Sequence, residues 1–292
     1  FCYFLLLEKS KKKFNKTILI FLFFSTSSSL LIERGNIDHI IFIIAVFIIF
    51  YSNYYYELFI IFLNSLLKVY PVFAFFYLTK YKKKIFFTLF SMILCFYLIY
   101  EISIAKYLDA NHSFMAISQA YGVQSITEGI FKTLEKKYSY FIDANTKNFI
   151  RLFSSLIFLF VCSLIFLIGS RRNSRIFSNI NDQEKLFLIG STIYIGSYIF
   201  YSNIDYRLVF LYLTIPYIEN FKNKINFTYC FSVLIISNSF IFSFAPLTIN
   251  HIIYTSFLYF IKLMILFFLC FNIGKISKNL LFNIKEKFIF LK

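Results

Sequence analysis

Long apolar runs separated by short basic clusters are the feature of this sequence that most constrains its fold. Many of the runs extend over about fifteen to twenty residues without a polar stripe at helical spacing, as in helices that cross a membrane. Hydrophobic residues make up 59% of the 292-residue chain, more than a soluble protein of this length can bury. The sequence therefore predicts an all-α, polytopic bundle of transmembrane helices.

The net charge of +16 fits two classes of protein, a nucleic-acid-binding protein and a membrane protein with basic loops. A nucleic-acid-binding protein would spread its lysines and arginines over one folded polar face. Here they cluster between the apolar runs, which is the pattern of cytoplasmic loops in polytopic proteins. We therefore expect membrane lipids, and no nucleic acid, as partners.

Placing every basic cluster in the cytoplasm requires about eight crossings. The expected organisation is a single integral membrane domain, residues 1–292, with the polar stretch 101–148 as an extracytoplasmic loop. The chain opens within an apolar run, so it is expected to be a fragment that lacks the beginning of its first helix.

One apolar stretch must leave the cytoplasm and return to it, because the lysine-rich run 80–84 follows it. We predict that this stretch forms a re-entrant pair of half-helices, 57–68 and 71–78. Pro71 supports the break, since proline fits the first turn of a helix and disfavours continuation through it.

Three polar motifs stand at helix starts on the predicted outer side of the membrane. They are Glu33-Arg34-Gly35-Asn36-Ile37-Asp38, Lys68-Val69-Tyr70-Pro71 and Asn203-Ile204-Asp205-Tyr206-Arg207. The N–H groups of a helix N-terminus attract anions, whereas a cation there is unfavourable unless an anion neutralises it. Because Arg34, Lys68 and Arg207 accompany these helix starts, the motifs predict a joint site for a lipid phosphate or pyrophosphate.

Local pairing is an alternative explanation for the same residues. Arg34 and Asp38 are one helical turn apart and form a possible ion pair. Arg207 is equally placed to pair with Asp205 or to reach the lipid headgroups. The sequence leaves both explanations open.

Other polar residues carry weaker signals. Nothing in the sequence brings His39, His112 and His251 together, so no metal site or cofactor is expected. Lys262 lies in the middle of an apolar run and should face the bundle interior. The five cysteines lie in or beside apolar runs and are expected to be buried as small hydrophobic residues.

The first two motifs resemble those of GT-C membrane glycosyltransferases related to bacterial polyprenol-phosphate-mannose-dependent mannosyltransferases, the family 87-like group. In this chain the Glu-Arg-Gly-Asn-Ile-Asp motif precedes an apolar helix, and the Lys-Val-Tyr-Pro motif follows some thirty residues later. Asp205-Tyr206-Arg207, followed by leucine-containing sequence and Pro216, is also similar to members of this group.

The resemblance implies a multi-pass hexosyltransferase of the bacterial inner (plasma) membrane. Such an enzyme takes a sugar from a polyprenyl phosphate and adds it to a lipid-linked or cell-surface glycan acceptor outside the cytoplasm. The implied substrate-binding residues are Glu33, Arg34, Asn36, Asp38, Lys68, Tyr70, Asp205, Tyr206 and Arg207. The family's catalytic base belongs to an external loop that no part of this chain matches, so the catalytic residue is unknown and this chain alone is expected to lack it.

Three other classes of membrane protein compete with the enzyme. A transporter or flippase for lipid-linked glycans would need charges with access from both faces, and the sequence shows no second set of mid-membrane charges beyond Lys262. An O-antigen-polymerase-like enzyme would carry paired arginines in its large external loop, and the long loop here has only lysines before Arg151. A structural membrane subunit is the third alternative.

Overall fold

The protein is described here by a computed structural model that covers residues 2–33, 37–79, 81, 84–107, 120–123, 127, 131, 144–171, 180–200, 203–239 and 249–289. Within these residues it is helical apart from two short antiparallel strands, β1 (Ala120–Tyr121) and β2 (Asn203–Ile204). The expected all-α class is therefore confirmed.

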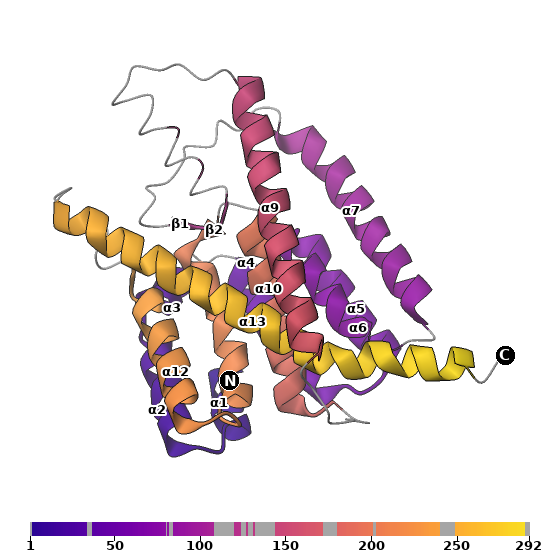
Figure 1. The fold of residues 1–292 in the computed structure, drawn as a ribbon, viewed down its shortest axis with the longest axis horizontal. Helices are drawn as coiled ribbons and strands as arrows, with labels where there is room; N and C mark the ends of the chain where they lie inside the picture. The colour runs from indigo at the N-terminus through magenta and orange to yellow at the C-terminus, as the bar shows by residue number, and fades with distance from the viewer. Residues whose placement is uncertain are drawn as a thin grey trace.

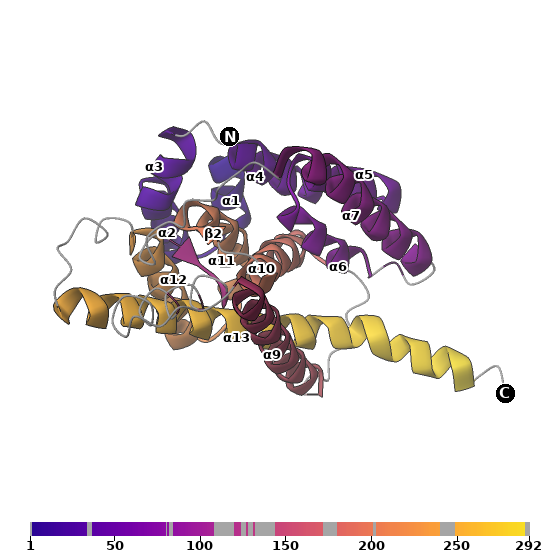
Figure 2. The same cartoon turned by 90° about the horizontal axis from the view of Figure 1, so that it is seen from above.

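The helices pack around α10, which lies near the middle of the bundle (Figures 1 and 2). In chain order they are α1 (Cys2–Lys9), α2 (Lys13–Phe23), α3 (Thr26–Glu33), α4 (Ile37–Phe47), η1 (Ile48–Phe50), α5 (Tyr54–Leu67), η2 (Tyr70–Ala74), α6 (Phe75–Leu78), α7 (Ile85–Tyr107), α9 (Ala144–Arg171), α10 (Asp182–Phe200), η5 (Asp205–Thr214), α11 (Ile215–Ile218), α12 (Asn223–Ser237) and α13 (Ile249–Ile289).

Two described helical segments, 146–171 of α9 and 254–277 of α13, are long and apolar enough to cross a membrane. A third crossing is added if α2 and α3, which meet at a 44° bend, count as one span. The other apolar helices are shorter; the 14 residues of α5 extend over roughly 21 Å, less than the ~30 Å hydrocarbon core. The bundle is consistent with a membrane protein, but the expected eight or so crossings are not confirmed.

Serine side chains explain the bend between α2 and α3. The hydroxyls of Ser25 and Ser28 both donate to the Leu22 carbonyl oxygen at 2.7 Å. Hydroxyls that donate to a backbone carbonyl oxygen in this way compete with the helical hydrogen bonds and bend the helix. Hydropathy alone therefore overestimates the length of this apolar segment.

The hairpin α5–η2–α6 carries the break that the sequence predicts. Asn53 caps α5 by accepting a hydrogen bond from the Tyr55 N–H at 3.0 Å, and α5 ends at Leu67, with Lys68 as its C-cap. Pro71 lies in the first turn of η2, as expected. The return leg then runs antiparallel to α5 and packs on α10.

Helices α9 and α13 approach each other closely because each has a glycine at the crossing point. A Cβ atom on Gly169 would collide with the Phe271 carbonyl oxygen, and one on Gly274 would collide with that of Phe166. Small residues permit such backbone approach between helices in a membrane. These two glycines therefore fix where the two longest apolar helices meet.

The two flanking helices extend into residues 101–148, which we predicted as an extracytoplasmic loop. Helix α7 continues to Tyr107 and α9 already begins at Ala144. Between them, the described residues include β1, which pairs with β2 at the start of η5. Apart from residues 120–123, 127 and 131, segment 108–143 lies outside the described residues.

Burial confirms two minor expectations. All five cysteines are buried with free thiols, and Lys262 faces the interior of the bundle with 1% of its surface exposed. Among the histidines, His39 is half-buried, while His112 and the side chain of His251 lie outside the described residues.

Candidate functional site

Asp38 is the centre of a buried ion cluster at the start of α4. One carboxylate oxygen accepts a hydrogen bond from the Tyr70 hydroxyl at 2.6 Å and lies 2.8 Å from the Lys68 ammonium. The other oxygen lies 3.4 Å from Nε of Arg207. The Asp38 side chain is 0% exposed, so a fully buried carboxylate joins parts of all three polar motifs.

Local structure positions each member of this Asp38 cluster. Asp38 lies in the first turn of α4, where a carboxylate is favourable for the helix dipole. Lys68 ends α5, and Tyr70 begins η2 just beyond it. Arg207 lies in η5, with its guanidinium carbon 4.8 Å from the centre of the Tyr70 ring.

Among the described residues, the cluster brings two cations, Lys68 and Arg207, to the Asp38 carboxylate. The side chains of Lys68 and Arg207 are 25% and 19% exposed, whereas that of Asp38 is fully buried. Burial lowers the pKa of Lys68 from its usual value, the bond to Asp38 opposes that shift, and nearby Arg207 adds to it. The exposed parts of the site are therefore its cationic side chains.

Several residues that we predicted for the site are not among the described members of the Asp38 cluster. Glu33 is exposed at the end of α3. Arg34 and Asn36 lie outside the described residues, as do the side chains of Asp205 and Tyr206. The alternatives that pair Arg34 with Asp38 or Arg207 with Asp205 therefore stay open, although Asp38 does bind Lys68 and Arg207 at longer sequence separation.

A second buried ion pair, which we did not foresee, lies near the start of α5. Glu57 is fully buried, accepts a hydrogen bond from the Tyr77 hydroxyl at 2.8 Å and lies 3.6 Å from the Lys185 ammonium. Lys185 also donates to the Tyr51 carbonyl oxygen at 2.7 Å. Lys262 is therefore not the sole buried charged residue within the described part of the bundle.

The hairpin thus carries a buried ion cluster at each end. Glu57 and Lys68 are eleven residues apart on α5, or roughly 16 Å along a helix. Tyr77 and Tyr70, both on the return leg, donate to the carboxylates of the two clusters. Sequence spacing had no means to signal the Glu57 cluster, because its cation comes from α10.

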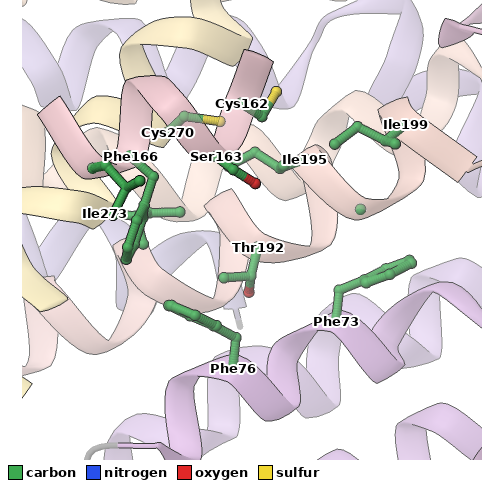
Figure 3. Close-up of a pocket in the computed structure, with 12 residues that line it drawn as sticks. Phe73, Phe76, Cys162, Ser163, Phe166, Thr192, Ile195, Ile199, Cys270 and Ile273 are labelled. Carbon is green, nitrogen blue, oxygen red and sulfur yellow. The ribbon is translucent and has the colours of Figure 1, made fainter. Parts of the chain in front are cut away.

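An apolar cavity of about 440 Å³ lies against the return leg of the hairpin (Figure 3). Phe73 and Phe76 face it from the hairpin, Thr192 from α10, Cys162 from α9 and Cys270 from α13. None of the described residues that line it is charged. Tyr70 and Phe73 are one turn apart, so η2 contributes both to the Asp38 cluster and to this cavity.

The comparisons with known proteins give no assignment. No family model matches the sequence, and no curated protein and no solved structure matches it. Among the residues the structure describes, no group of three or more histidine, cysteine, aspartate or glutamate side chains is arranged to hold a metal ion.

Proposed function

We propose that this chain is a membrane glycosyltransferase that binds a polyprenyl-phosphate sugar and transfers the sugar to a lipid-linked or cell-surface glycan. The polar part of the proposed site is the Asp38 cluster. On the same proposal the protein is a multi-pass protein of a bacterial plasma membrane, with this site on the extracytoplasmic side.

The observation that carries the proposal is the meeting of Lys68 and Arg207 on one buried carboxylate. Asp38 holds the two cations at one place, and part of each cationic side chain stays exposed. A phosphate that approached the exposed sides of Lys68 and Arg207 would form charge-assisted hydrogen bonds with both.

The roles follow from the contacts. Both oxygens of Asp38 already have donors, so we assign Asp38 to positioning the two cations and not to proton transfer. Lys68 and Arg207 would stabilise the negative charge on the lipid phosphate as it leaves the anomeric carbon in a single displacement. No described residue is assigned as the catalytic base.

A lipid substrate also needs a place for its hydrocarbon tail. The apolar cavity is lined by Phe73, one turn from Tyr70 on η2, and most of the apolar surface of α9 is exposed. A ligand with an anionic head and an apolar chain therefore suits this part of the molecule better than a soluble phosphate.

Replacing Lys68 with methionine is expected to weaken binding of a short-chain polyprenyl phosphate by about tenfold or more, because one charge-assisted hydrogen bond is lost. Arg207→Met should act in the same direction. Binding is measured on the purified full chain by native mass spectrometry, with thermal denaturation as a check that each variant is folded.

Lys9 provides a matched control, because it also lies 2.8 Å from a carboxylate, that of Asp182, and its side chain is 30% exposed. Lys9→Met should leave the affinity within roughly twofold of the unchanged protein. Unaltered binding by Lys68→Met, or an equal loss in Lys9→Met, would show that the Asp38 cluster does not hold the phosphate.

A transporter or flippase for the same lipid is the second candidate, favoured by the Glu57–Lys185 pair. A carrier needs charged groups that are reached from both sides of the membrane, and the hairpin has an ion cluster at each end. Within the enzyme proposal, this second pair is structural.

The double variant Glu57→Gln/Lys185→Met separates these two functions, because it removes both charges of the pair together. The enzyme proposal expects polyprenyl-phosphate binding within roughly twofold of the unchanged protein and no protein-dependent movement of a fluorescent polyprenyl phosphate across proteoliposomes. Movement by the unchanged protein that the double variant abolishes would favour the transporter instead.

A further inference from the structure

Two basic loops lie side by side at the end of the bundle where α2 and α12 begin (Figures 1 and 2). Within them, the Lys12 ammonium donates to the Asn223 side chain at 3.2 Å. The Glu219 carboxylate, at the end of α11, accepts hydrogen bonds from the backbone N–H groups of Lys11 and Lys12. The relative position of the loops is therefore fixed by bonds and does not depend on a ligand.

Five lysines in these loops and in the first turns of α2 and α12 have exposed side chains and form what we call the lysine patch: Lys11, Lys13, Lys16, Lys222 and Lys224. Within the described part of the chain, none of the five forms an ion pair. Glu219 is buried and is occupied by N–H and O–H donors. The patch therefore presents concentrated positive charge, with Glu8 as the nearest exposed carboxylate in the sequence.

An aromatic surface continues from the lysine patch along the two helices. The ring of Phe14 stacks on Phe227 with a centroid separation of 5.5 Å, and Phe227 stacks on Phe231 at 5.8 Å. Phe227 and Phe231 are 53% and 47% exposed. We call these three residues the aromatic ladder, which starts beside the lysines and runs up α12.

We propose that the lysine patch and the aromatic ladder together form a binding site for an anionic phospholipid. The acidic headgroup would rest on the lysines, and one acyl chain would lie along the three rings. Lysines near an anionic membrane surface contribute favourably one by one, and aromatic rings are common where the headgroups meet the chains. This site does not depend on the proposed glycosyltransferase activity.

The two parts of the surface argue for a lipid in preference to an acidic protein segment. A peptide carboxylate would use the lysines but would leave the aromatic ladder exposed, whereas a phospholipid uses both. The fixed loops reduce the ordering cost of binding, because the cations are already held close together.

The site is tested with the purified full chain in an uncharged detergent, by counting retained lipids and measuring their affinity with native mass spectrometry. Phosphatidylglycerol is expected to bind about tenfold or more tightly than phosphatidylcholine. Replacing the five lysines of the patch with glutamine should abolish this preference. The variant should fold, since its lysines are exposed and several stand at helix starts, where a positive charge is unfavourable.

A matched control replaces five basic residues elsewhere in the chain with glutamine: Lys132, Lys136, Lys137, Lys147 and Arg151. This control has the same net charge as the patch variant and should keep the preference for phosphatidylglycerol. If the patch variant keeps that preference too, or the control loses it equally, the assignment is wrong and an acidic protein partner becomes the better explanation.

The double variant Phe227→Ala/Phe231→Ala tests the contribution of the lipid acyl chain to binding. It should weaken phosphatidylglycerol binding several-fold, whereas millimolar inorganic phosphate should not displace the lipid from the unchanged protein. Unaltered affinity in this variant, together with displacement by inorganic phosphate, would identify a site for free phosphate and overturn the lipid assignment.

Discussion

Replacing Asp38 with alanine is expected to lower the free energy of unfolding by about 3 kcal/mol or more. The change removes a carboxylate with 0% exposure and leaves the Lys68 ammonium and the Arg207 guanidinium beside each other. The Tyr70 hydroxyl loses its acceptor as well. Thermal denaturation in detergent, followed by circular dichroism, measures the loss as a lower Tm.

Asp182 is the control for this prediction, because it lies 2.8 Å from Lys9 but its side chain is 39% exposed. Exposed ion pairs contribute about 1 kcal/mol at most, so Asp182→Ala should shift the Tm little. Combining Asp38→Ala with Lys68→Met should recover part of the lost stability, because it removes one of the two cations that would lose the Asp38 carboxylate. Equal losses for Asp38→Ala and Asp182→Ala would contradict the central role of Asp38.

The break in the hairpin and the meeting of parts of the three motifs were predictable from the sequence. Pro71 marks the start of the return leg, and the lysines after it require the chain to turn back. The same alternation of basic clusters placed Lys68 and Arg207 on one side, and they do meet, at Asp38. Predicting the membrane side of each motif thus helped to predict contacts between residues that are far apart in the chain.

The partners within that site were less predictable. Rules for helices relate residues three or four apart, and these rules suggested pairs within each motif. The hydrogen bonds of Asp38 instead span 32 residues to Tyr70 and 169 residues to Arg207. Such pairing depends on how α4, η2 and η5 pack, which no local spacing encodes.

The number of crossings and the second ion pair were not predictable for related reasons. Hydropathy does not reveal where an apolar run is interrupted, as it is by the serine hydroxyls between α2 and α3. Glu57 and Lys185 lie on helices that are distant in the sequence, and each looked like an ordinary residue near a helix end. The first feature depends on hydrogen bonds within the segment itself, and the second on how α10 meets the hairpin.

Glu219 is expected to be the strongest stabilising residue at the end of the bundle where α2 and α12 begin. Its carboxylate accepts hydrogen bonds from the Ser10 hydroxyl at 3.0 Å, the Lys11 N–H at 2.8 Å, the Lys12 N–H at 3.0 Å and the Gln183 amide at 2.6 Å. Lys12 is the N-cap of α2 and has no side-chain cap of its own. One glutamate thereby supplies the start of α2 with acceptors from another part of the chain.

Glu219→Ala should therefore lower the free energy of unfolding by about 3 kcal/mol, because it leaves several buried donors without an acceptor. Hydrogen exchange at the Lys11 and Lys12 amides should accelerate more than exchange in α9, which has no contact with this carboxylate. Glu33, an exposed glutamate at the end of α3, provides the control, since Glu33→Ala removes the same charge but no buried bond. A Tm for Glu219→Ala close to that of Glu33→Ala, with unchanged exchange at Lys11 and Lys12, would mean that packing alone holds the two loops together.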